Sequence, residues 1–117
     1  MTDTLGVHSE VGRLRQVVVH RPGLELSRLT PGNCRDLLFD DVLWAERARE
    51  EHDAFTQVLR EQGVTVHHFD QLLAEVLGSE AARAFVLDRL CTAELVGPAL
   101  AGPLRGYCED TDPGTLA

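Results

Sequence analysis

Hydrophobic and polar positions change their period along the first half of the chain. Residues 13–20 read Arg-Leu-Arg-Gln-Val-Val-Val-His and end in β-branched residues, before Pro22 and Gly23 stop the run. A short apolar run bounded by turn residues is typical of a strand buried on both faces. We therefore predict a largely buried strand at 13–20, followed by a turn and by an ordered loop up to Arg35.

After Asp41 the apolar side chains recur at helical spacing. Between residues 42 and 62 they lie three or four positions apart with charged residues between them, as in a helix that packs one side on a sheet. Gly63 provides a C-terminal stop, and residues 64–69 then alternate as in a short strand. If the helix crosses over between the two strands, the strands are parallel. The helix positions that we expect to be core are Trp44, Ala48, Phe55 and Leu59.

The remaining residues predict further helices. Segments 71–77, 79–90 and 92–105 carry helical apolar patterns, with Gly and Pro interrupting the last, and residues 107–117 are typical of a turn and the start of another helix. A unit of two strands and one packed helix leaves sheet edges and a helix face uncovered. The pattern thus favours an α/β unit whose further strands come from additional chain or from another molecule.

Composition argues against several classes of function. The chain has 19 acidic and 11 basic residues, a formal charge of −8 and no lysine, which opposes nucleic-acid binding because phosphates are neutralised by clustered cations. No run approaches the roughly 18–20 apolar residues that cross a bilayer, and residues 1–6 lack the features of a secretory signal. We therefore expect a soluble cytoplasmic protein with neither a nucleic-acid nor a membrane partner.

Cysteine and histidine are too sparsely spaced to suggest a metal site. Cys34, Cys91 and Cys108 are separated by 57 and 17 residues, which offers neither a disulfide framework nor a paired C-x-x-C motif. We expect free thiols. The five histidines show no H-x-x-x-H spacing, and His67 and His68 fall on opposite faces of their predicted strand, so we expect no bound metal.

Two adjacent carboxylates, Asp40 and Asp41, stand where the loop ends and the long helix begins. An aspartate at such a position can cap the exposed amides of the first turn and oppose the positive end of the helix dipole. The same carboxylates could shape a pocket for a guanidinium, because a buried cation has to be paired. From the residues alone we favour at least one of them as a cap or structural acceptor, and the binding role stays open.

Four short strings, in one order, resemble the N-terminal segment of arginine deiminases, within the guanidino-group-modifying (pentein) superfamily. The strings are H-S-E-V-G-R-L-R from His8, H-R-P-G from His20, L-T-P-G-N from Leu29 and L-L-F-D-D from Leu37. The resemblance is close over residues 5–70. From residue 71 onward it keeps only the general pattern of the helical segment that follows in that family.

The resemblance implies an α/β fold, the α/β propeller of the penteins, in which ββαβ-type blades surround a central site. Residues 1–70 would form the first blade, and residues 71–117 would begin a helical insertion that is truncated. It also implies hydrolysis of L-arginine to L-citrulline and ammonia in arginine catabolism, through a Cys thiolate and a covalent amidino intermediate, with no metal or organic cofactor. The family's catalytic Cys, His and acidic residues belong to segments beyond residue 117, so we expect no catalytic residue in this chain and no activity from it alone.

By the same resemblance, the loop that contains residues 37–41 faces the active site. Leu38 is expected to contribute to the wall of the arginine pocket, with Asp40 and Asp41 as further substrate-binding candidates, whereas none of the three cysteines matches the catalytic one. Two alternatives stay open: a stand-alone, non-catalytic interaction module that completes its sheet with another chain, and part of a related deiminase acting on another guanidino compound such as agmatine. Whether the parent is a homo-oligomer also stays open.

Overall fold

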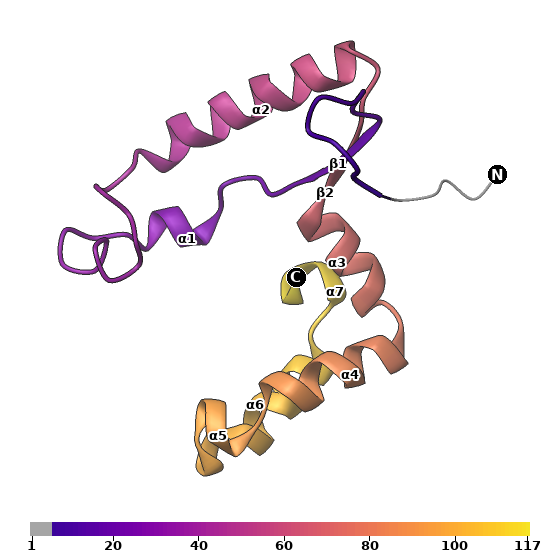
Figure 1. The fold of residues 1–117 in the computed structure, drawn as a ribbon. Helices are drawn as coiled ribbons and strands as arrows, with labels where there is room; N and C mark the ends of the chain where they lie inside the picture. Colours follow the sequence, from indigo (N-terminus) through magenta and orange to yellow (C-terminus); the bar gives the residue numbers. More distant parts are fainter. Residues whose placement is uncertain (1–5) are drawn as a thin grey trace. The chain divides into compact units, whose positions relative to one another are not determined.

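The computed structural model describes residues 6–117, and residues 1–5, over which no secretory signal is predicted, lie outside the described residues. The chain forms two compact units, one extending to Val66 and the other from His67 to Ala117. Figure 1 shows the strands β1 and β2 and the helices α1 to α7 along the chain. The described residues therefore form a mixed α/β structure, as predicted, with most of the helices in the second unit.

The first unit is built on a strand, helix, strand sequence. β1 (Gln16–Val19) is followed by the short α1 (Leu24–Ser27), the long α2 (Ala45–Glu61) and β2 (Thr65–His68), which begins at the end of this unit. The two strands pair in parallel, with the Thr65 amide donating to the Arg15 carbonyl at 2.9 Å. α2 is thus the crossover connection, and the predicted parallel pairing is confirmed.

Two details of the first unit differ from the sequence prediction. β1 is only half-buried, with Val18 54% exposed, because within the described chain it has a single neighbouring strand and little that covers its faces. α2 begins at Ala45 instead of residue 42, with Trp44 at its N-cap. Its C-terminal end follows the prediction, since Gly63 adopts a positive φ of 77° directly after the helix.

The apolar stripe of α2 is only partly covered within residues 6–117. Trp44 is 71% exposed and Phe55 is 55% exposed, so the expectation that they are core is wrong for this chain. The most buried side chain of α2 is instead Thr56, whose hydroxyl donates to the Asp53 carbonyl at 2.9 Å. The unit lacks enough other chain to cover a whole helix face, and its hydrophobic cluster lies at the start of α2, against the loop after α1.

The second unit is helical apart from the last two residues of β2. It contains α3 (Phe69–Leu77), α4 (Glu80–Leu90), α5 (Ala93–Val96), α6 (Pro98–Asp110) and α7 (Pro113–Leu116). The segment predicted to be helical at 92–105, with interruptions by Gly and Pro, forms two helices, because Gly97 with a φ of +86° turns the chain between them. α3 packs against α7, and α4 packs against α6. Within residues 6–117, no helix has the length and apolar character needed to span a bilayer.

Candidate functional site

The loop between α1 and α2 is held in shape by its own backbone and by one asparagine. Asn33 accepts a hydrogen bond from the Thr30 amide at 2.7 Å and donates to the Arg28 carbonyl at 3.0 Å. The Phe39 amide donates to the Cys34 carbonyl at 2.8 Å, which closes a further turn. Beneath these turns lies a small buried cluster, against which Phe39, Ala45 and Ala48 pack; its members are Leu26, Leu29 and Cys34.

Leu38 stands at the tip of this loop in an unusual conformation. Its φ is +63°, which makes it the one non-glycine residue with positive φ in the described part of the chain. Its side chain is 94% exposed. A left-handed conformation costs a residue with a Cβ about 1–2 kcal/mol, and such strain tends to occur at ligand-binding sites. The loop therefore directs an apolar side chain outward, and contacts within the described chain do little to stabilise this conformation.

The two aspartates have different environments within the described structure. Asp41 is a structural acceptor, since its Oδ1 accepts a hydrogen bond from the Val42 amide at 2.7 Å. This bond lies outside the helix, so neither aspartate caps α2, and the prediction of a cap or structural acceptor is met by Asp41 as an acceptor. Asp40 is exposed and makes no hydrogen bond or ion pair with any residue in 6–117. Its carboxylate is thus open to an external cation.

Ion pairs near the start of the loop link it to α2. Arg21 donates two parallel hydrogen bonds to Asp53, Nε to Oδ1 and Nη2 to Oδ2, both of 2.8 Å. This hydrogen-bonded guanidinium lowers the pKa of Asp53 below its usual range. Glu25 accepts a 2.7 Å bond from the Gly23 amide, which is the main cause of its lowered pKa, and lies 3.3 Å from His20 Nε2. Arg21 is therefore a structural ion-pair partner of Asp53.

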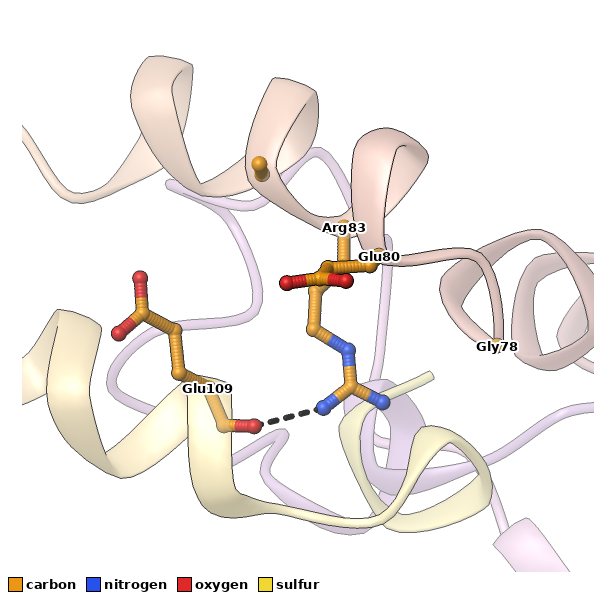
Figure 2. A pocket seen from close by; sticks show the side chains of 5 residues that line it. Gly78, Glu80, Arg83 and Glu109 are labelled. Carbon is orange, nitrogen blue, oxygen red and sulfur yellow. Dashed lines mark hydrogen bonds between the residues drawn. The ribbon is translucent and has the colours of Figure 1, made fainter.

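A hollow of about 500 Å³ lies in the helical unit and is drawn in Figure 2. Arg83 projects across it from α4, beside Glu80 and facing Glu109 of α6. The guanidinium donates to three backbone carbonyls: those of Leu77 at 3.0 Å, Glu109 at 2.8 Å and Thr111 at 2.9 Å. Three of the five N–H donors of this guanidinium bond to the backbone at helix ends, so we interpret the hollow as a joint between helices.

Other candidate groups form no catalytic arrangement in the described chain. Cys34 is buried, and its thiol lies 3.8 Å from the Pro31 carbonyl. No cluster of three or more His, Cys, Asp or Glu side chains suited to a metal occurs among residues 6–117. That no metal binds therefore stays a prediction. The predicted substrate-binding residues Leu38, Asp40 and Asp41 lie on the loop before α2, and their binding role stays a prediction.

Sequence inspection missed two residues that matter here. Asn33 shapes the loop, and its position after Pro31 and Gly32 in a turn-forming string was the available signal. Arg83 joins three helix ends, and nothing in the local sequence marks an arginine between alanines for this role. The positive φ of Leu38 also has no local signal, because leucine is not a residue that favours it.

Comparison with known proteins gives matches over nearly the whole chain. The family model described as "Arginine deiminase" matches residues 35–113, which include the candidate loop. A curated arginine deiminase of Mycobacterium marinum is 46% identical over 117 residues, covering all of this chain and 29% of its own length. The arginine deiminase of Rhodococcus erythropolis is 50% identical over 114 residues, which cover 97% of this chain and 28% of the relative. The arginine deiminase of Mycolicibacterium gilvum is 47% identical over 119 residues, which cover 100% of this chain and 30% of the relative. The chain spans less than a third of these relatives.

Proposed function

Because this chain belongs to the arginine deiminase family, a family of hydrolases, we propose that it is the N-terminal part of a cytoplasmic enzyme that converts L-arginine to L-citrulline and ammonia. The relatives that carry this name are more than three times as long as the aligned segment, and they match it at 46–50% identity. In this proposal the described chain supplies one wall of the substrate pocket. The thiolate that attacks the guanidinium carbon, and its His and acidic partners, belong to the rest of the enzyme.

The observation that carries the proposal is the conformation of Leu38. A leucine at φ +63° with a side chain 94% exposed gains little within residues 6–117, so both features call for a partner outside them. An apolar wall suits arginine, because the methylene stem of the substrate can lie against a leucine while its charged end reaches acidic groups. Asp40, whose carboxylate has no partner within the described chain, is the candidate acidic group on this side.

The proposed fold is one blade of a pentein propeller followed by the start of a helical insertion, divided near residue 70. The parallel β1 and β2 with the crossover α2 fit part of such a blade, and the helical unit fits the insertion. The exposed apolar side chains of α2 support the same proposal, since a propeller supplies neighbouring chain against them. Alone, the chain lacks the proposed nucleophile and is expected to be inactive.

The test uses the full-length protein that carries this sequence, with arginine as substrate and citrulline as the measured product. In the Leu38→Ala variant, kcat/KM for arginine should fall by about 10-fold or more, because part of an apolar pocket wall is lost. Leu37→Ala is the matched control: Leu37 is the neighbouring leucine, is 54% exposed and has no positive φ, and this variant should keep its kcat/KM.

The results separate the alternatives. A full-length protein that forms no citrulline from arginine contradicts the proposed reaction, and product formation from agmatine instead would identify a deiminase of another guanidino compound. Citrulline formation by the purified 117-residue chain would contradict the assignment of the catalytic groups to the rest of the enzyme. Equal losses in the two leucine variants would refute the specific role of Leu38.

A further inference from the structure

Two cysteines of the helical unit open onto one cavity. The cavity has a volume of about 440 Å³ and is lined by leucine and valine side chains of α3 to α7, with Cys91 and Cys108 as its only sulfur atoms. Cys91 ends α4, and Cys108 lies in the last turn of α6. Both thiols are free and partly exposed, whereas Cys34 of the other unit is buried. Partial exposure is the condition under which a soluble oxidant reaches a thiol.

The helices that carry the pair are held together beside it. Arg105 of α6 donates to Asp88 of α4 at 2.6 Å and to Glu109 of its own helix at 2.8 Å. Asp88 lies three residues before Cys91, and Arg105 lies three residues before Cys108, so the bridge between the helices is one turn from each thiol. The backbone around the cysteines is therefore already brought together without a covalent bond.

The two cysteines are electrostatically linked. Burial raises the pKa of the Cys108 thiol, and the nearby Cys91 side chain raises it further. Both side chains line the same apolar cavity, which places the two cysteines on one enclosed surface. The raised pKa disfavours Cys108 as the first attacking thiolate, because the thiolate is the reactive form.

We propose that Cys91 and Cys108 form a redox couple, in which glutathione disulfide converts the two thiols into an intramolecular disulfide that ties the end of α4 to α6. The Cys91 thiolate attacks one sulfur of glutathione disulfide and releases one glutathione thiolate, leaving a mixed disulfide at Cys91. The Cys108 thiolate then attacks the Cys91 sulfur and releases the second glutathione. The protein loses two electrons and two protons, and glutathione disulfide is reduced to two glutathione molecules.

The disulfide would close a loop that contains α5 and most of α6. A cross-link of this kind stabilises a fold mainly by restricting its unfolded state. The oxidised helical unit should therefore open less often, and trypsin should cleave the folded chain after Arg105 several-fold more slowly than in the reduced form. Reduction by dithiothreitol should restore the original rate. Neither measurement depends on enzymatic activity, so the inference can fail or hold independently of the proposed function.

Peptide mapping tests the inference on the full 117-residue chain, incubated dilute with glutathione disulfide. Trypsin places the three cysteines in separate peptides, residues 29–35, 90–105 and 106–117. We expect an intact mass lower by two hydrogens and a link between peptides 90–105 and 106–117 that dithiothreitol removes. Cys34→Ser should keep this link, and Cys91→Ser should prevent it. A link to peptide 29–35, glutathione adducts without the internal link, or no change in mass would each overturn the inference.

Discussion

Replacing Arg83 by methionine should loosen the helical unit, because this side chain holds the ends of its helices together. Arg83 Nε donates to the Leu77 carbonyl at 3.0 Å, and Nη1 donates to the carbonyls of Glu109 and Thr111 at 2.8 and 2.9 Å. The guanidinium thereby joins the ends of α3 and α6 to α4, and Figure 2 shows its bond to Glu109. Methionine keeps the apolar stem and fills similar space, so that the variant removes chiefly these three bonds.

The size of the effect follows from the bonds. A hydrogen bond to a charged group contributes about 1.5–3 kcal/mol when buried, and the half-exposed position of Arg83 places each bond nearer ~1 kcal/mol. Three such bonds, offset in part by the more apolar methionine side chain at this partly buried position, give a loss of about 2 kcal/mol. Since 1.4 kcal/mol is a factor of ten, local opening should become about 30-fold more frequent.

Hydrogen exchange followed by mass spectrometry measures that opening in the 117-residue chain. The amides of α6 and of Thr111 should exchange about 30-fold faster in Arg83→Met. Arg89→Met is the matched control on the same helix, because Arg89 donates only to the Phe85 carbonyl one turn earlier and lies over the Phe85 ring at 3.4 Å. If the two variants change exchange in α6 equally, the joint does not depend on Arg83 and the reasoning is refuted.

Two further predictions concern the first unit. Arg21 lowers the pKa of Asp53 in the folded state, so the ion pair stabilises the fold above the usual aspartate range, and this stabilisation is lost as pH falls through the lowered pKa. Urea midpoints measured against pH should show the loss. The Asp53→Asn variant should lack this pH dependence, whereas the Asp36→Asn control should keep it. Gly63→Ala should lower the free energy of unfolding by about 1 kcal/mol, because the φ of Gly63 is +77° and steric contact is not involved, since nothing lies within 4 Å of an added Cβ. Gly32→Ala is the control, because a Cβ added there lies at an ordinary 3.8 Å from Thr30 Oγ1. Equal urea midpoints for the two variants would contradict the backbone argument.

The order of strand, helix and strand could be predicted because each element carries its signal locally. The β-branched run of β1, the helical spacing of α2 and Gly63 each act within a few residues, and the structure follows them. The start of α2 was predicted three residues too early. The Val42 amide donates a hydrogen bond to the Asp41 side chain, and the helix begins only at Ala45. The signal at Gly97 is local as well, since the predicted interruption of segment 92–105 occurs there, at a positive φ.

The candidate site was predictable only in part, for a different reason. The string around Leu38, Asp40 and Asp41 identifies the loop, but the conformation of Leu38 is imposed by turns that start at Asn33 and Cys34. Arg83 gives no signal at all, because its partners are carbonyls up to 28 residues away. Side chains whose role is to join distant backbone ends become visible only in three dimensions.

The wrong prediction for the α2 stripe is itself informative. Periodicity correctly identifies which side of a helix is made for burial, but it cannot say which chain covers that side. Trp44 and Phe55 are more than half exposed in this chain, while Leu26 and Leu29, under the loop, are buried. In the proposed full-length enzyme the two observations have one explanation: the loop that presents Leu38 is fixed from within, and α2 is covered by the chain that also supplies the nucleophile. On that account the loop should keep its shape in the 117-residue chain even where catalysis is absent.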